Sequence, residues 1–260
     1  SDDFTDVMYC CALDENGVNK FLGSKYFKAL PSMVFNDIYM ALEKNEKVLI
    51  VGLPCEISSL KNFLGKEYTN LYTVELICHG PTSPSILEKY IKEIEENRHL
   101  KVNWLNCRAK KPFWKPYYIS LRFTDGTELS FPFTNSPLEK AFQALKRPSC
   151  NECAFKDGSS CADLLIGDYH GAMKETAEYN KYGVSVCFAI TPKGKELISI
   201  LNECGFATGD ADVNRAKANK ALFSSLEKLR IRKRYLTVFL KHGVIAASND
   251  PIINSGLKKR

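Results

Sequence analysis

Apolar and polar positions change their period several times along the first hundred residues of the chain. Residues 33–44 carry apolar side chains at helical spacing, and residues 47–53 form a short apolar run typical of a strand buried on both faces. Residues 57–64 return to helical spacing, and residues 72–78 predict a second strand. Residues 83–94 begin with Ser-Pro, an N-cap followed by proline at the first helical position. This order predicts parallel strands joined by right-handed crossovers.

The middle of the chain changes to an antiparallel pattern. Residues 117–123 and 128–133 alternate between apolar and polar side chains and flank Asp125-Gly126, a strong hairpin signal. Beyond them we expect a helix at 137–145, strands at 164–169 and 184–191, and a helix at 192–204. The predicted fold class is therefore α/β, with a mainly parallel sheet flanked by helices, an antiparallel hairpin insertion and a helical C-terminal segment.

The end of the chain is basic. Residues 211–260 hold 12 lysines and arginines against 3 acidic residues, although the whole chain has a net charge of only +6. Leu222, Leu226, Leu229 and Leu236 recur at mostly helical spacing, with basic residues between them. This pattern predicts an amphipathic helix whose basic face is solvated. Binding to nucleic acid or to an acidic partner is the alternative, and the scarcity of aromatic residues among 228–234 disfavours nucleic acid. We expect residues 1–210 to form the α/β domain and residues 211–260 a basic helical extension packed on it.

Composition narrows the class of protein. The hydrophobic fraction of 45% and the charged fraction of 25% are ordinary for a globular protein. No apolar run approaches the roughly 20 residues that a membrane span needs, and the opening Ser-Asp-Asp lacks the layout of a signal peptide. We therefore expect a cytoplasmic protein. In a reducing compartment, its 10 cysteines favour metal, cluster or redox use over a disulfide framework.

Two cysteines follow predicted parallel strands. Cys55 comes directly after the first strand and Cys78 ends the second. In one parallel sheet both thiols emerge at the same carboxyl edge, where open α/β sheets place their ligands. Because neighbouring strands lie only about 4.8 Å apart, the two sulfurs could serve one cofactor.

A second pair of cysteines has metal-ligand spacing. Cys150 and Cys153 are separated by two residues, so both thiolates can face one metal centre, although redox dithiols use the same spacing. Together with Cys55 and Cys78 they match the demand of a 4Fe–4S cluster for four cysteines, and equally that of a Cys₄ zinc site. Cys161 is a candidate substitute ligand. Spacing alone leaves these alternatives open.

Several short motifs occur in a consistent order along the chain. They are Gly-Ser-Lys-Tyr at 23–26, Gly-Leu-Pro-Cys-Glu at 52–56, Cys-His-Gly at 78–80, Arg-Pro-Ser-Cys-x-x-Cys at 147–153 and Ala-Asp-Leu-Leu-Ile-Gly-Asp at 162–168, with a weaker continuation at Arg215 and Asn219. From about residue 20 to residue 240 this pattern resembles the C-terminal domain of the beta subunit of coenzyme F-420 hydrogenases and dehydrogenases. The chain departs from the family at Glu56, where Gln is usual, and at Cys107, where Phe is common. It also lacks the ferredoxin-like cysteine segment that usually precedes this domain.

The resemblance implies an oxidoreductase that contains FAD and at least one 4Fe–4S cluster. Electrons would pass between the cluster, the flavin and a two-electron partner of the deazaflavin type or another small-molecule redox substrate. An electron-donor protein or a ferredoxin-like domain would be the protein partner, and self-association into a homo-oligomer is compatible with this arrangement. The resemblance assigns Cys55, Cys78, Cys150 and Cys153 as the cluster ligands.

Cationic and hydroxyl side chains are the candidates for binding the flavin. By resemblance, Ser24, Lys25 and Tyr26 fall in a motif that would hold a phosphate, with an ordinary Gly-Ser turn and a solvated lysine as the alternative. Arg108 and Lys110 follow a strand-like segment and could meet an anionic cofactor. Exposed basic side chains are the ordinary explanation for the same residues.

Four further candidates lie at the predicted edge of the sheet. Gly52 and Pro54 would shape the turn beside the cofactor, or serve only the turn itself. His79 is the candidate catalytic residue, because its imidazole could hydrogen-bond a sulfur or deliver a proton to reduced flavin, while a structural cap is the alternative. Asp168 would orient a cofactor or cap a turn.

Two other functions are compatible with the same residues. The first is a zinc-stabilised interaction module that uses its basic tail. The second is a cysteine-nucleophile enzyme that pairs Cys55 or Cys78 with His79 or His170. Adjacent residues of a strand point to opposite faces, which makes Cys78 and His79 a poor dyad.

Overall fold

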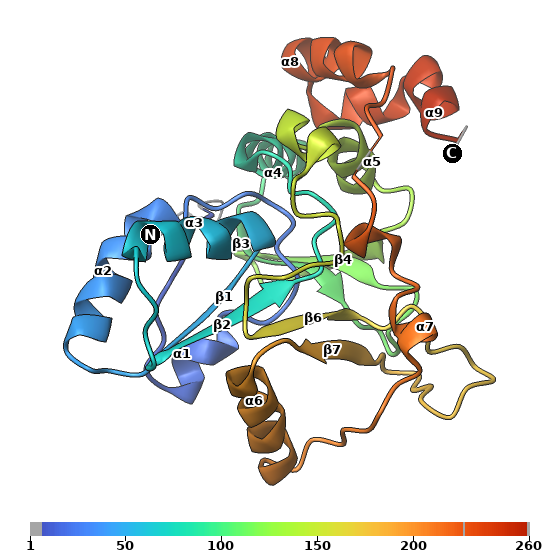
Figure 1. Cartoon of the computed structure of the whole chain (residues 1–260). Helices are drawn as coiled ribbons and strands as arrows, with labels where there is room; N and C mark the ends of the chain where they lie inside the picture. Colours follow the sequence, from blue (N-terminus) through green and yellow to red (C-terminus); the bar gives the residue numbers. More distant parts are fainter. Residues whose placement is uncertain (1–6, 226, 259–260) are drawn as a thin grey trace. The chain divides into compact units, whose positions relative to one another are not determined.

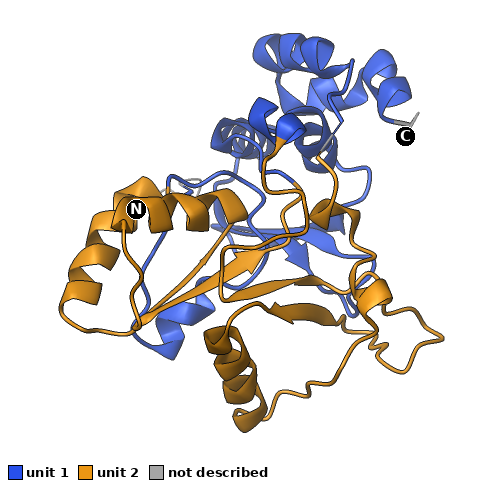
Figure 2. Cartoon of the chain, in the orientation of Figure 1, with its two compact units in different colours: residues 1–30, 80–152, 226–260 blue, residues 31–79, 153–225 orange. Residues whose placement is uncertain are grey.

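The computed structural model describes residues 7–225 and 227–258 of the chain. The chain divides into two compact units (Figure 2). Unit 2 comprises residues 31–79 and 153–225, and unit 1 comprises residues 1–30, 80–152 and 226–260. The chain therefore passes from one unit to the other four times. Two of these passages fall directly after His79 and between Glu152 and Cys153, within the predicted site motifs.

Unit 2 contains a four-stranded sheet with the strand order β1-β2-β6-β7 (Figure 1). Its strands are β1 (Val48–Gly52), β2 (Leu71–Leu76), β6 (Leu164–Asp168) and β7 (Ser185–Ala189). The first three are mutually parallel and β7 runs antiparallel to β6. The prediction of a mainly parallel sheet, with strands 47–53 and 72–78 as neighbours, is confirmed.

Helices flank this sheet. Unit 2 contributes α2 (Ser32–Glu43), α3 (Pro54–Leu64), α6 (Pro192–Glu203), α7 (Val213–Ala216) and the short 3-10 turn η2 (Lys220–Leu222). Helix α3 packs against β1 and β2, and α6 packs against β6 and β7. The helical spacing of α3 buries Ile57 and Leu60 completely, so this helix ties the turn after β1 to the core.

The expectation that the first strand is buried on both faces is wrong. Strand β1 lies at an edge of its sheet, and Leu49 and Val51 on one of its faces are 57% and 45% exposed. Only Ile50 and Gly52, on the other face, are buried. A continuous apolar run therefore marked an edge strand with one uncovered face.

Unit 1 contains an antiparallel sheet with the strand order β3-β4-β5. Its strands are β3 (Val102–Ala109), β4 (Tyr118–Phe123) and β5 (Glu128–Pro132). The turn between β4 and β5 has Gly126 at a φ of 84°, a conformation that favours glycine, and Thr127 donates its N–H to the Asp125 carboxylate. The predicted hairpin is confirmed.

Four helices of unit 1 share one hydrophobic core with this sheet: α4 (Pro84–Arg98), α5 (Pro137–Ala144), α8 (Arg232–Asn249) and α9 (Pro251–Lys258). The short helix α1 (Glu15–Asn19) and the 3-10 turn η1 (Pro148–Glu152) contribute no buried residue. Ser83 caps α4 as predicted, by accepting the N–H of Ser85. The core includes Phe123 of the sheet and Tyr235 of α8, both fully buried.

The amphipathic helix expected from Leu222 onward begins later than predicted. Leu222 is buried in η2, Leu226 lies outside the described residues, and α8 begins only at Arg232. The basic C-terminal segment is also shared, since 211–225 belong to unit 2 and the residues after them to unit 1. The predicted boundary at residue 210 stays a prediction. Among the described helices, none has the length and apolar character to cross a membrane.

Candidate functional site

Cys55 and Cys78 both follow the carboxyl ends of neighbouring parallel strands. Gly52, the last residue of β1, is in register with Glu75 near the end of β2. Cys55 lies in the first turn of α3 and Cys78 lies two residues beyond β2. Both thiols are half-buried. The topology of unit 2 thus brings two chemically reactive groups to one edge of its sheet.

The turn that carries Cys55 is fixed by its neighbours. Pro54 occupies the start of α3, where a missing N–H costs nothing. The buried carboxylate of Glu56 accepts the N–H of Leu53 at 2.8 Å and closes the turn. Cys55 therefore lies in the first turn of a helix whose start is fixed by its neighbours.

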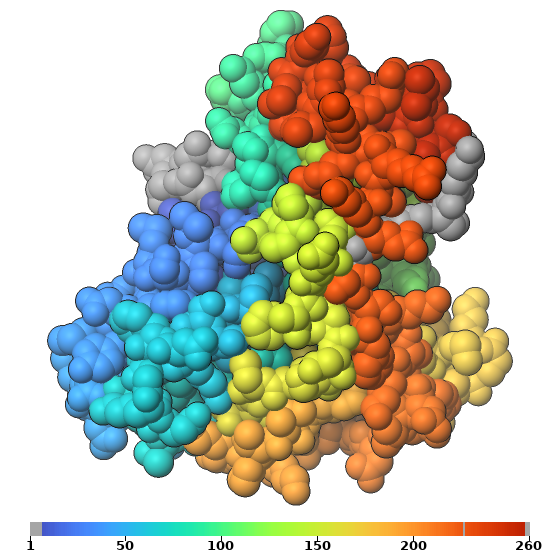
Figure 3. All heavy atoms as spheres, turned by 45° about the horizontal axis from the view of Figure 1, so that its top comes forward, coloured from blue at the N-terminus to red at the C-terminus, as the bar shows by residue number. Residues whose placement is uncertain are grey.

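Lys156 connects the loop after Cys153 to the end of β2. Its ammonium group donates hydrogen bonds to the main-chain carbonyls of Cys78 and Ala221. The N–H of Cys153 donates to the Ser225 hydroxyl at 3.0 Å. Figure 3 shows the chain around residues 153–156, in yellow-green, beside the chain around residues 221–225, in orange. Within unit 2, Cys153 is thereby held in the same region as Cys78.

Cys161 has a different environment. Its thiol donates to the carboxylate of Glu75 at 3.1 Å, and Ser160 donates to the other oxygen at 2.5 Å. Burial and this carboxylate raise the pKa of the Cys161 thiol to about 12. Since metal ligation requires the thiolate, these contacts favour Cys153 over Cys161 as a ligand.

Two imidazoles lie near the same edge of the sheet. The ring centroids of His79 and His170 are 6.2 Å apart. His79 follows Cys78 beyond β2, and His170 follows β6, the parallel neighbour of β2. Both side chains are exposed, and Asp168, the last residue of β6, is half-buried. Sequence analysis singled out His79 and Asp168 and used His170 only in the cysteine-nucleophile alternative.

Unit 2 also contains buried donors that sequence analysis missed. Within the described chain, the Asn219 side-chain nitrogen and the Tyr169 hydroxyl have no hydrogen-bond partner. Their residues are only 1% and 2% exposed. An unsatisfied buried donor costs about 1–3 kcal/mol, so such groups call for a physical reason. The only sequence signal was the weak motif continuation at Asn219, whose carboxamide oxygen accepts the Ala221 N–H that starts η2.

Three predicted flavin-binding residues belong to one neighbourhood of unit 1. The Arg108 guanidinium lies 3.5 Å from the Ser24 hydroxyl and 5.1 Å over the ring of Tyr117. The Tyr26 ring packs against that of Phe133 at 5.3 Å. Burial raises the pKa of Tyr26 well above its ordinary value, so its hydroxyl stays protonated. These three side chains together offer a guanidinium and two hydroxyls beside aromatic rings.

The other two predicted flavin-binding residues have separate positions. Lys25 donates to the main-chain carbonyls of Phe21 and Leu22 at 3.2 and 3.1 Å, and burial lowers its pKa. Its ammonium group therefore holds a turn of its own backbone. Lys110 comes directly after β3 and is exposed.

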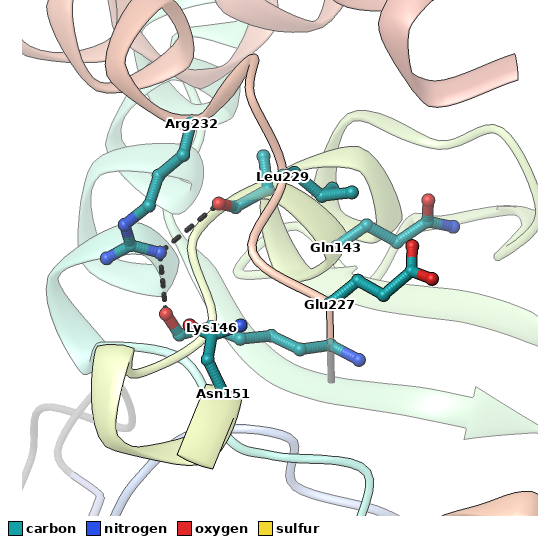
Figure 4. A pocket seen from close by; sticks show the side chains of 7 residues that line it. Gln143, Lys146, Asn151, Glu227, Leu229 and Arg232 are labelled. Carbon is teal, nitrogen blue, oxygen red and sulfur yellow. Dashed lines mark hydrogen bonds between the residues drawn. The ribbon is translucent and has the colours of Figure 1, made fainter. Parts of the chain in front are cut away.

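A small hollow in unit 1 is lined by basic and polar side chains (Figure 4). Its lining includes Lys146, Asn151 of the Cys-x-x-Cys segment, and Arg232. Arg232 donates to the main-chain carbonyls of Ala144 and Lys146 at 3.2 and 2.6 Å. The hollow admits no more than a water-sized group, so it is too small for a cofactor. The hydrogen bonds of Arg232 instead join the start of α8 to the end of α5.

The four predicted cluster ligands are divided between the units. Cys55, Cys78 and Cys153 belong to unit 2, and Cys150 belongs to η1 of unit 1. Across residues 7–225 and 227–258, no three His, Cys, Asp or Glu side chains form a ready metal site. All four thiols are half-buried and none is in a disulfide. Cysteine thiols that could ligate a metal are therefore present, but the described side chains do not enclose a metal site.

The mainly parallel sheet flanked by helices, with thiols and imidazoles following the carboxyl ends of its strands, defines an α/β protein of the open-sheet class, in which ligands bind at that edge. The family model for the C terminus of the coenzyme F420 hydrogenase/dehydrogenase beta subunit matches residues 45–212, and the chain belongs to this family. This makes it a redox domain of an oxidoreductase family. The matched region includes all four candidate ligands and ends before η2 and α8. No curated protein matches the chain.

Proposed function

We propose that this chain transfers electrons between a 4Fe–4S cluster held by Cys55, Cys78, Cys150 and Cys153, a bound FAD, and a two-electron substrate. The hydrogen bond from Lys156 to the carbonyl of Cys78 is the observation that carries the proposal. It holds the loop after Cys153 at the strand end that presents Cys78. Sheet topology brings Cys55 and Cys78 to one edge, and this contact adds the loop after Cys153.

The residues present fit such a centre in three respects. The four thiols are half-buried, which shields a cluster from water while leaving it accessible to electrons. The unpartnered amide nitrogen of Asn219 is suited to donate to a sulfur. Cys161, the other cysteine near this loop, donates its thiol hydrogen to Glu75 and so does not compete with Cys153 as a metal ligand. Because the described thiols do not form a closed site, we expect metal loading to draw them together and stabilise the protein.

The cluster would supply transfer of single electrons, and the flavin would exchange either one electron or a hydride. The residues of the chain bind and orient these groups. Pro54 and Gly52 fix the turn that presents Cys55, and Lys156 fixes the backbone at Cys78. His79 is exposed at the same edge and can hold or release a proton when the flavin changes its protonation. Asp168 ends β6, the strand next to β2, and would orient the cofactor at this edge.

The anionic part of the flavin would bind in unit 1. The Arg108 guanidinium lies beside the Ser24 hydroxyl, with the Tyr26 hydroxyl close to both, and a guanidinium with hydroxyls is a combination suited to a phosphate. Lys110 adds positive charge nearby along the chain. Lys25 would then act indirectly, because its hydrogen bonds to Phe21 and Leu22 shape the turn that precedes Tyr26.

Anaerobic purification followed by iron, sulfide and flavin analysis tests this proposal. We expect a brown protein, and serine variants of Cys55, Cys78, Cys150 and Cys153 should each lose iron. Cys161→Ser and the exposed Cys204→Ser are the matched controls and should retain it. Wild-type protein that stays colourless and iron-free after anaerobic reconstitution would refute the cluster. Stoichiometric zinc in the same preparation would favour the zinc-stabilised interaction module instead.

A separate variant pair tests the flavin site. Arg108→Met should reduce FAD content, since it removes the cation beside Ser24. Arg122→Met is the control, because Arg122 also lies 5.1 Å over an aromatic ring of the same sheet, that of Trp104, and has no hydroxyl neighbour in the proposed site. Equal flavin content in the two variants would remove Arg108 from the site.

The redox partners follow from the same proposal. The family suggests a multi-protein hydrogenase or dehydrogenase, so an electron-donor protein or ferredoxin-like domain would deliver electrons to the cluster. A deazaflavin or another small two-electron carrier would exchange them with the flavin. The cytoplasmic location and the homo-oligomer expected from the sequence stay predictions.

A further inference from the structure

Lys156 is an ammonium group held between main-chain oxygens at the edge of the sheet in unit 2. Its hydrogen bonds go to the carbonyls of Cys78 and Ala221. Among the described residues it has no carboxylate partner, and the neighbouring carboxylate of Asp157 accepts hydrogen bonds from Ser159 instead. Lys156 is half-buried. It is therefore an ammonium group that makes no ion pair among the described residues.

Lys193 has the same bonding pattern at the opposite end of the same strand. Its ammonium group donates to the carbonyls of Tyr68 and Leu71 at 2.7 Å each, at the amino end of β2. Lys193 also acts electrostatically on the buried carboxylate of Asp163 and helps to lower the pKa of that group. The two lysines tie backbone in the same way, so Lys193 is a matched comparison for Lys156 away from the cysteines.

Asn219 provides a second, independent indication. Its side-chain nitrogen is buried and has no partner in the described chain, while its oxygen caps η2 at Ala221. Ala221 is also the residue whose carbonyl binds Lys156. Among the described residues, an ammonium group without an ion pair and an amide donor without a partner thus occur in one small network that includes Cys78. Both groups are suited to an anion that accepts hydrogen bonds.

We infer that Lys156 and Asn219 are positioning residues that stabilise the reduced state of an anionic, thiolate-bound metal centre at Cys78. This inference rests on the proposed function. A centre ligated by cysteine thiolates is anionic, and gaining one electron adds one negative charge without forming or breaking a bond. A nearby cation and an N–H donor to sulfur favour the more negative state and so raise the reduction potential.

The test compares Lys156→Met with Lys193→Met in the full chain. Both variants remove an ammonium group that ties two carbonyls, so both should lower the thermal stability. After anaerobic reconstitution with iron and sulfide, the iron content, the visible spectrum and the reduction potential in dye equilibration are measured. We expect a lower reduction potential for Lys156→Met than for wild type, and an unchanged potential for Lys193→Met. Loss of iron from Lys156→Met alone would show that this lysine only holds the Cys153 loop in place, and it would overturn the inference.

The outcomes separate this inference from the proposed function. Wild-type protein that binds no iron would refute both. Wild-type protein that binds iron, with equal iron content and equal potential in wild type and Lys156→Met, would overturn only the inference, as would equal shifts in the two lysine variants. If Lys156→Met does not fold, Lys156→Gln is judged by the same criteria. Asn219→Asp keeps the oxygen that caps η2, removes the amide donor and adds a negative charge, so its potential should fall in the same direction.

Discussion

The Glu93 carboxylate accepts the main-chain N–H of Val244 at 2.6 Å. Its second oxygen accepts the N–H of Ile245 at 2.9 Å. Helix α8 bends just before these residues, at Gly243, so its second half begins with N–H groups that have no partner within the helix. Glu93 of α4 thus caps a helix far away in sequence, within unit 1.

Replacement of Glu93 should destabilise unit 1. Glu93→Ala leaves two helix-terminal N–H groups without their acceptor, and we expect a loss of about 1–2 kcal/mol in the free energy of unfolding. Glu96→Ala, at an exposed position of the same helix, should change it by less than about 0.5 kcal/mol. Urea denaturation measures both. A Glu93→Ala protein as stable as Glu96→Ala would show that the contact is not important for stability.

Gly243 should tolerate no side chain. Its φ is 90°, and an added Cβ would lie 2.1 Å from the Glu93 carboxylate. We expect Gly243→Ala to lower the free energy of unfolding by about 1–3 kcal/mol, because it combines backbone strain with the loss of the Glu93 cap. Gly209→Ala is the control, since nothing lies within 4 Å of its added Cβ. Thermal unfolding of the two variants should therefore differ clearly.

The thiol of Cys161 should react slowly. Burial and the Glu75 carboxylate raise its pKa to about 12, so at about pH 8 almost none of it is thiolate. In metal-free protein we expect iodoacetamide to modify the exposed Cys204 well before Cys161, as followed by peptide mass spectrometry. In Glu75→Gln the carboxylate charge is lost and modification of Cys161 should accelerate. Rapid alkylation of Cys161 in wild type would contradict the hydrogen bond.

The ion pair between Arg234 and Asp250 should make stability depend on acid pH. Hydrogen bonds from Arg234 lower the pKa of Asp250 from 3.8 to about 2. A lowered pKa means that the folded state favours the carboxylate, so this contribution is present above pH 3.8 and is lost as the pH falls toward 2. Asp250→Asn should flatten the dependence in this window. Denaturation curves at several pH values would detect the difference, and identical acid profiles would exclude the pair as a cause.

Some of this structure could be predicted because the signals are local. The helical and strand periods, the proline starts of α3 and α4 and the Asp-Gly turn each depend on a few adjacent residues. The common edge for Cys55 and Cys78 followed from one general rule, that strands joined by a helix run parallel.

Other features depend on contacts that sequence spacing does not contain. The exposure of Leu49 depends on β1 having a neighbour on only one side, which no local pattern reveals. The contact between Lys156 and Cys78 joins residues far apart in the chain, and lysine in a loop carries no signal of its own. The helical spacing from Leu222 onward did not reveal that Leu222 is buried in η2 and that α8 starts only at Arg232.

The four passages of the chain between the units determine the order in which the protein can be completed during synthesis. Unit 2 lacks part of its structure until Ser225 has left the ribosome, and unit 1 waits for α8 and α9 after that. A chain that stops at residue 210 would have made neither η2 nor Asn219. Premature termination between residues 210 and 225 would therefore leave two unfinished units, not one finished domain and a missing tail.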